Sequence, residues 1–120
     1  PDIIKNMPPE MLFDYLAVRL LPEKAAGKNY IINIIFNDLN EKYTLYIENS
    51  VLNHTTKFND DPDVSLTLTK ATLDEVQLGV ITLEKAISNG DIKLNGDKKV
   101  FKDFVGMLDS FDFWFNIVTP

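Results

Sequence analysis

The segment Tyr30–Phe36 constrains the fold more than any other part of the sequence, because Asn33 is its only strongly polar residue. In an extended chain, successive side chains point to opposite faces. One face then carries Tyr30, Ile32, Ile34 and Phe36, and the other carries Ile31 and Ile35. A strand that is apolar on both faces lies in the centre of a sheet or is covered by helices. The segment is also much shorter than the roughly 20 apolar residues of a membrane span.

Three further strands are expected after this one. Apolar and polar residues alternate at 43–47, which predicts a strand with one buried face. A more polar stretch rich in β-forming residues at 51–58 predicts an exposed third strand, and the regular alternation at 64–69 predicts a fourth. Clusters of turn-forming residues separate these strands, at 37–40, 49–50 and 59–63. The sequence therefore predicts four strands in one antiparallel meander.

Helices are expected on both sides of this meander. Pro8-Pro9-Glu10 favours a first helix over 9–21, followed by a loop at 23–29. In the second half, helix-capping residues predict short helices starting at Thr72 and Thr82, and alternation predicts a fifth strand at 91–95. The last helix has an apolar face made of Val100, Phe101, Phe104, Val105 and Leu108. A chain of 120 residues is too short for two cores, so we expect one α+β domain over 1–120.

Charge and cysteine content exclude several functions. The formal net charge is −6, and Arg19 is the only arginine, whereas a nucleic-acid-binding protein needs clustered Lys and Arg against the phosphates. The absence of cysteine rules out disulfides, a thiolate zinc site and a Cys nucleophile. We therefore expect neither a nucleic-acid partner nor a membrane span.

The candidate catalytic or metal-binding residues are few. His54 is the single histidine and lies among threonines, so it favours a strand residue over a metal ligand or part of a triad. The acidic run at 60–63 lacks the spacing of a calcium loop and is typical of a solvated turn. Glu10 and Asp14 are four residues apart on the first helix, which favours charge at a helix start over acid–base chemistry. No phosphate-binding glycine motif occurs.

The apolar residues of the final third are the feature most open to a functional interpretation. Beyond the apolar face of the last helix, the segment 111–118 contains Phe111, Phe113, Trp114, Phe115, Ile117 and Val118. Two explanations remain open at this point. One is an ordinary core with a docked terminus, and the other is a cleft of a size to hold a lipid.

Several short motifs resemble the sterol carrier protein type two superfamily. They are Leu73-x-x-Val76-x-Leu78-Gly79, Thr82-Leu83, Gly90-Asp91-Ile92-Lys93 and Gly96-Asp97. The resemblance implies a mostly antiparallel five-stranded sheet packed against four to five helices, and members of that superfamily enclose an apolar tunnel for acyl chains or sterols.

Longer segments are similar to the C-terminal domain of the bacterial linear alkyl sulfatases, whose parent enzymes belong to the metallo-β-lactamase superfamily. These segments are 7–20, 40–45, 48–54 and 111–120. The resemblance covers nearly the whole chain. Since the chain also begins Pro1-Asp2-Ile3 without methionine, we expect it to be a piece of a longer protein.

The resemblance implies a division of labour within that longer protein. The two zinc ions and the hydrolysis of sulfate esters would belong to a metallo-β-lactamase-like domain with an H-x-H-x-D-H motif, which this sequence lacks. This chain alone would then be no enzyme and would hold no cofactor. It would bind the hydrocarbon tail of a long-chain alkyl sulfate, a fatty acid or a similar lipid. The residues expected to line the site are Leu12, Leu16, Phe101, Phe104, Val105, Leu108 and Trp114.

Two alternatives to this function are kept. The chain could be a stand-alone carrier of lipids or sterols, or a structural module that docks on another domain through its aromatic tail. The compartment stays open, and a periplasmic or secreted parent enzyme would fit the resemblance.

Overall fold

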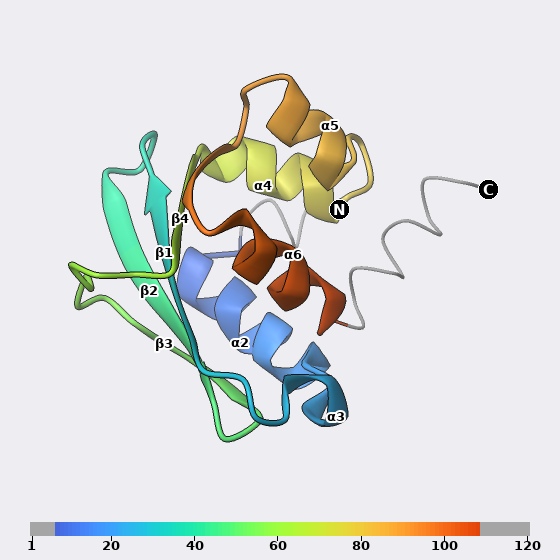
Figure 1. The fold of residues 1–120 in the computed structure, drawn as a ribbon. Helices are drawn as coiled ribbons and strands as arrows, with labels where there is room; N and C mark the ends of the chain where they lie inside the picture. The colour runs from blue at the N-terminus through green and yellow to red at the C-terminus, as the bar shows by residue number, and fades with distance from the viewer. Residues whose placement is uncertain (1–6, 109–120) are drawn as a thin grey trace.

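The computed structural model describes residues 7–108 and arranges them as one layer of strands and one of helices. The sheet has the strand order β3-β2-β1-β4-β5, and the helices lie together on one of its faces (Figure 1). The strands are β1 (Tyr30–Phe36), β2 (Glu41–Glu48), β3 (Val51–Thr55), β4 (Val64–Leu68) and β5 (Lys93–Gly96). The helices are α2 (Pro9–Arg19), α3 (Pro22–Ala25), α4 (Lys70–Gln77), α5 (Leu83–Ser88) and α6 (Lys98–Gly106). The predicted α+β class is confirmed.

Strand β1 lies in the middle of the sheet, as its apolar residues on both faces predict. It pairs antiparallel with β2 on one side and parallel with β4 on the other. On the face toward the helices, Ile32 and Phe36 are completely buried. On the other face Asn33 is buried and Ile31 and Ile35 are partly buried, and such cover on both faces agrees with the lack of polar alternation in this segment.

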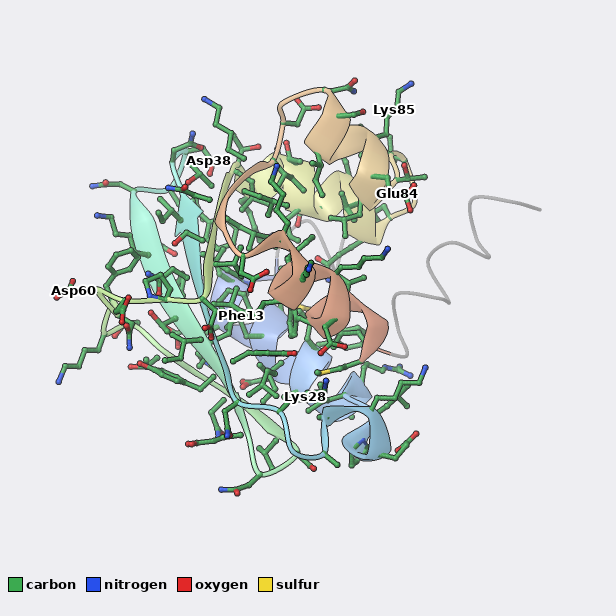
Figure 2. The ribbon with its side chains drawn as sticks, viewed as in Figure 1. Phe13, Lys28, Asp38, Asp60, Glu84 and Lys85 are labelled. Atoms are coloured by element: carbon green, nitrogen blue, oxygen red, sulfur yellow. The ribbon has the colours of Figure 1, made fainter. Side chains whose placement is uncertain are left out.

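The predicted meander of four strands is wrong at its last step. Strands β1, β2 and β3 do follow one another in antiparallel pairs. The chain then leaves β3, crosses the sheet on the face away from the helices, and adds β4 beside β1 instead of beside β3. Figure 2 shows Asp60, which lies on this crossing segment, on the far side of the sheet from the helices.

Hydrogen bonds from the sheet explain why the chain crosses there. Asn33 donates from Nδ2 to the backbone carbonyl of Asn59 at 2.7 Å and accepts at Oδ1 from the Thr44 hydroxyl at 2.6 Å. The Thr44 hydroxyl also accepts from the backbone N–H of Asn59 at 3.1 Å. Asn33 and Thr44 are both completely buried. We call Asn33, Thr44 and Asn59 the outer-face network, and it holds the crossing segment on β1 and β2.

Three local predictions also need correction. The expected loop at 23–29 begins with the short helix α3, because Pro22 occupies a first helical position, where its missing N–H costs nothing. The third strand ends at Thr55 and does not reach residue 58. The N-cap of α4 is Thr69 and not Thr72: the Thr69 side chain accepts from the backbone N–H of Thr72.

The core lies between the sheet and the helices. Phe13 of α2 is buried there, with its ring centroid 5.2 Å from that of Tyr43 and 6.4 Å from that of Phe36 (Figure 2). Buried apolar residues from α6 and from β1, β2 and β4 complete the same cluster. Within residues 7–108, no helix has the length and apolar character needed to cross a membrane.

Candidate functional site

A cavity of about 80 Å³ lies inside the core, between the sheet and helices α2, α4 and α6. All but one of its lining residues are apolar, and the exception is Gln77. The sheet contributes Ile34, Leu45, Leu66 and Leu68, and α2 contributes Leu12, Phe13 and Leu16. Helix α6 contributes Phe101, Phe104 and Val105, and Leu108 follows two residues after its end. The remaining lining residues are Leu73, Val76, Gln77, Leu83 and Ile92.

Six of the seven residues expected from the sequence line this cavity. They are Leu12, Leu16, Phe101, Phe104, Val105 and Leu108. The seventh, Trp114, lies outside the residues that the structure describes. Sequence reasoning missed the wall formed by β4 and α4, although the alternation of β4 and the apolar spacing of Leu73 and Val76 were available as signals.

Four of the lining residues are only partly buried and mark the mouth of the cavity. They are Leu16, Leu73, Leu83 and Val105, and we call them the mouth residues. They come from α2, α4, α5 and α6, so the mouth opens on the helical side of the molecule and not through the sheet (Figure 1).

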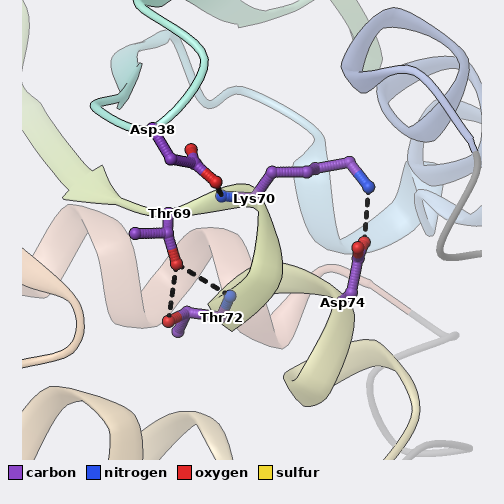
Figure 3. Close-up of polar contacts among 5 residues, drawn as sticks. All are labelled: Asp38, Thr69, Lys70, Thr72 and Asp74. Atoms are coloured by element: carbon purple, nitrogen blue, oxygen red, sulfur yellow. Dashed lines mark hydrogen bonds and ion pairs between the residues drawn. The ribbon is translucent and has the colours of Figure 1, made fainter.

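Helix α4, which forms one wall, is fixed at its first turn (Figure 3). The backbone N–H of Lys70 donates to both carboxylate oxygens of Asp38, at 2.9 and 3.0 Å, and so ties the helix to the turn between β1 and β2. Lys70 Nζ also pairs with Asp74 Oδ1 at 2.5 Å, and both residues are buried. A negative charge at a helix N-terminus is favourable, and the ion pair keeps both buried charges compensated. These contacts therefore hold the first turn of α4 against the turn between β1 and β2.

Helix α6, the opposite wall, is fixed at both ends. At its start, the Asp97 carboxylate accepts from the backbone N–H of Lys99 at 2.9 Å. The preceding Gly96 has φ +110°, and a Cβ there would lie 2.6 Å from the carbonyl oxygen of Asp63, so only glycine fits. At its end, the backbone N–H of Leu21 donates to the carbonyl of Met107 at 2.8 Å. The cavity-lining residues between these ends are thereby held in place.

A polar contact joins α6 to the sheet at the rim of the core. The Tyr30 hydroxyl donates to Asp103 Oδ2 at 2.5 Å, and Lys28 Nζ lies 3.4 Å from the same oxygen. The hydrogen bond to the Asp103 carboxylate, together with burial, raises the pKa of Tyr30 to about 12. Tyr30 is therefore neutral throughout the physiological range and acts here as a hydrogen-bond donor.

The remaining candidates from the sequence do not assemble a reactive site. His54 lies in β3, as predicted, with its ring centroid 5.5 Å from that of Phe13 and its Nδ1 3.6 Å from Asp14 Oδ1. Asp63, from the acidic run, accepts from the backbone N–H of Ile31 at 2.7 Å, so this side chain bonds to the backbone of strand β1. Among residues 7–108, no group of three or more His, Cys, Asp and Glu side chains is placed to hold a metal ion.

The electrostatics of the cavity follow from its lining. Gln77 is 3% exposed, and its Oε1 is buried without a hydrogen-bond partner among the described residues. The other lining residues offer neither charge nor a nucleophile. A lining of this kind matches hydrocarbon in its chemical character.

Comparison with known proteins agrees with this geometry. The chain matches the alkyl sulfatase C-terminal family over residues 1–120. It is 46% identical over 121 residues to a linear primary-alkylsulfatase of Pseudomonas sp., and the match covers 100% of this chain and 18% of that protein. The chain therefore spans less than a fifth of that relative's length.

Solved structures support the same relationship. The stereoselective inverting sec-alkylsulfatase Pisa1 from Pseudomonas sp. superposes with a TM-score of 0.80 at 40% identity, over 88% of this chain and 17% of that one. Sterol carrier protein-2 from Aedes aegypti, solved with palmitate, has a TM-score of 0.59 at 10% identity, over 87% of this chain and 98% of that one. The second likeness concerns the fold, which confirms the predicted sterol-carrier-like architecture. The chain belongs to the alkyl sulfatase C-terminal family.

Proposed function

We propose that this chain binds the hydrocarbon tail of an alkyl sulfate ester, or of a lipid with a similar tail, on behalf of a longer alkyl sulfatase. The observation that supports this most directly is the apolar cavity between the sheet and helices α2, α4 and α6, whose lining has Gln77 as its one polar residue. The sterol carrier protein that shares the fold was solved with a C16 fatty acid, which is a ligand of the same chemical class.

Burial of a hydrocarbon chain is sufficient to provide the affinity. Each methylene removed from water contributes about 0.8 kcal/mol, so a twelve-carbon chain contributes roughly 10 kcal/mol before the costs of association and ordering. No charged contact with the ligand is needed. The sulfate group can therefore remain outside the cavity, in water or in contact with another domain.

The size of the cavity implies that the helices move when a long chain enters. An apolar cavity of about 150 Å³ is known to hold a benzene molecule. The cavity of about 80 Å³ is smaller and accommodates only a short part of an alkyl chain. Leu16 of α2 and Val105 of α6 both line the cavity and are only partly buried, and we propose that α2 and α6 separate there to admit the rest of the chain.

Hydrolysis belongs, in this proposal, to the part of the longer protein that lies outside this chain. The two zinc ions implied by the family resemblance would be held there. The described residues of this chain do not fit a metal centre, because they bring no suitable group of His, Cys, Asp and Glu together. This chain would receive the alkyl tail and leave the sulfate end accessible to the catalytic domain.

A pair of tryptophan substitutions on α2 tests the binding function. Leu16→Trp places a bulky ring at the mouth, whereas Val18→Trp places the same ring on the outer surface of the same helix, where Val18 is 83% exposed. We expect the wild type and Val18→Trp to bind decyl sulfate below its micelle concentration, with heat released in calorimetry and a raised Tm. Leu16→Trp is expected to lose most of this binding. If the wild-type chain shows neither heat nor a rise in Tm, the proposed function is wrong.

A second candidate function, docking onto another part of the longer protein, is supported by a separate observation. Met11 and Val18 are 55% and 83% exposed and lie seven residues, about two turns, apart on the same side of α2. Val18→Asp in the longer enzyme tests this. Loss of assembly with unchanged selectivity for chain length would favour docking as the main role, whereas an unchanged assembly would exclude this surface.

A further inference from the structure

The tripeptide Asn-Gly-Asp occurs twice in this chain, at 89–91 and at 95–97. An Asn-Gly pair is chemically labile, because the glycine nitrogen can attack the side-chain carbonyl carbon of the asparagine and glycine has no Cβ to hinder the ring closure. Both asparagines and both glycines are exposed. Since the two sites share the same three residues, a difference in their reactivity has to come from the fold.

The first site closes the end of a helix. Asn89 is the C-cap of α5, and Gly90 follows it with φ +85°. The N–H of Gly90 donates to the carbonyl of Ile87 at 3.1 Å. The N–H of Asp91 donates to the carbonyl of Ala86 at 2.9 Å, and the two bonds together form the Schellman motif that ends many helices. The attacking nitrogen at this site is therefore engaged, and the attack has to break its hydrogen bond.

The corresponding nitrogen at the second site is not engaged by the neighbouring strand. Strand β5 lies at the edge of the sheet and pairs antiparallel with β4, with Gly96 opposite Val64. The N–H of Asp97 donates to the carbonyl of Asp63 at 2.8 Å, so the next pair along is a hydrogen-bonded one. Because bonded and non-bonded pairs alternate in an antiparallel ladder, the N–H of Gly96 points away from β4. Within residues 7–108, no strand pairs with that edge of β5.

The residues directly after Asn95 fix the start of helix α6. Gly96 packs so closely against β4 that an added Cβ would lie 2.6 Å from the carbonyl oxygen of Asp63. Asp97 is the N-cap of α6, and its carboxylate accepts from the backbone N–H of Lys99 at 2.9 Å. A longer backbone at Asn95 would move both Gly96 and Asp97 out of these contacts.

We propose that Asn95 is a site of spontaneous deamidation through a cyclic imide with Gly96, and that the isoaspartate formed there loosens helix α6. The Gly96 nitrogen bonds to Cγ of Asn95, the Cγ–Nδ2 bond breaks, and ammonia leaves with the proton of the Gly96 N–H. One water then opens the imide at either carbonyl. Opening at one carbonyl gives aspartate, and opening at the other gives isoaspartate, whose β-carbon becomes part of the main chain. This covalent change does not depend on a ligand in the cavity.

Incubation of the folded chain at mildly alkaline pH tests the choice of site. Trypsin cleaves after Lys93 and so separates the two sites into different peptides, whose deamidated fractions mass spectrometry measures. We expect Asn95 to react about tenfold faster than Asn89, the factor that corresponds to one net hydrogen bond. In urea, where the chain is unfolded, the two sites should react at similar rates. A reaction at Asn89 in the folded chain that is as fast as that at Asn95, or faster, would overturn the proposal.

Substitutions test the effect on helix α6. Asn95→Gln slows the ring closure, and Asn89→Gln is the matched control at the other site. We expect the isoaspartate form, separated by chromatography, to have a Tm lower by roughly 5 °C, the shift expected from the loss of one helix cap. Wild type and Asn89→Gln should therefore lose Tm during incubation, whereas Asn95→Gln should not.

Asn95→Asp separates the added charge from the added backbone atom. This variant carries the carboxylate on a main chain of normal length, and before incubation it should melt like the wild type. If Asn95→Asp melts as low as the isoaspartate form, the charge and not the longer backbone is responsible. If the isoaspartate form melts like the wild type, Asn95 may react but α6 is not loosened, and that part of the proposal is wrong.

Discussion

Two buried side-chain amides lie on the two sides of the same sheet, and their surroundings differ completely. Asn33 points to the outer face, where Thr44 and Asn59 bond both ends of its amide at 2.6 and 2.7 Å. Gln77 lies on the helical side, beside a cavity, with its Oε1 unbonded. The two residues carry the same functional group at similar burial.

The two sides of the sheet differ in how their buried amide groups are hydrogen-bonded. The three residues of the outer-face network bond one another, which holds the crossing segment on the sheet. The helical side contains the cavity, whose wall is almost entirely apolar, and Gln77 Oε1 is buried beside it without a hydrogen-bond partner among the described residues. Burial alone therefore does not show whether a polar group is satisfied, whereas the count of hydrogen bonds made by its atoms does.

The largest expected effect is on the helical side. Phe104→Ala should lower the free energy of unfolding by about 4 kcal/mol, because it removes a buried ring and enlarges the cavity. Urea unfolding measures the loss, and Lys102→Ala, exposed on the same helix, should change little. Decyl sulfate should restore part of the lost stability. A loss below about 1 kcal/mol would show that α6 does not pack against the sheet as described.

On the outer face, Asn33→Ala should cost about 3 kcal/mol, since it breaks two hydrogen bonds: the Asn59 carbonyl loses its donor, and the buried Thr44 hydroxyl loses its acceptor. Asn53→Ala on the exposed side of β3 serves as the control. Ligand affinity per folded molecule should be unchanged, because the network does not touch the cavity. Weakened binding of decyl sulfate in folded Asn33→Ala would contradict the separation of the two sides.

At the rim of the helical side, Tyr30→Phe should cost about 1 kcal/mol at neutral pH, through loss of the bond to the partly exposed Asp103. A tyrosine ionises near pH 10 in the unfolded chain, whereas in the folded protein its pKa is raised to about 12. The stability from this contact is thus complete below pH 10 and is lost as the pH rises to about 12. Stability curves across this range should be shallower for Tyr30→Phe than for the wild type, and equal slopes would argue against the contact.

The smallest expected change in stability is for Gln77→Met without ligand. No hydrogen bond of Gln77 Oε1 is lost, so the free energy of unfolding should stay constant or rise by up to about 1 kcal/mol. This result would contrast with Asn33→Ala, although both substitutions remove a buried amide. Thermal and urea unfolding measure it, with Leu73→Met as the control. A loss of about 2 kcal/mol or more would mean that the amide has a structural partner after all.

The sequence predicted all five strands, four from a regular alternation or an apolar run and the third from its content of β-forming residues, although the third ends earlier than predicted and the fifth is shifted to Lys93–Gly96. It did not predict that β4 pairs with β1, since this depends on contacts among Asn33, Thr44 and Asn59, which are up to 26 residues apart. In isolation, Asn33 is only an interruption in an apolar strand. Helix α3 was missed because four residues are too few to show a helical period.

The candidate site was partly predictable for similar reasons. The cavity residues on α2 and α6 follow from helical spacing, which local sequence reveals. The burial of Gln77 could not be predicted in this way, because glutamine is common on the exposed surface of helices and the residues next to it in the sequence do not indicate that it is buried. Its burial depends on the packing of α4 against the rest of the domain, and only the folded arrangement shows that.

The position of β4 beside β1 also bears on how the chain reaches its folded state. Hairpins can close between neighbouring segments, so β1, β2 and β3 can associate early through short-range encounters. The parallel pair of β1 and β4 needs the closure of a longer loop than either hairpin, and closing a longer loop has a larger entropic cost. Formation of the cavity wall contributed by β4 is therefore expected late in folding, after the three-stranded part already exists.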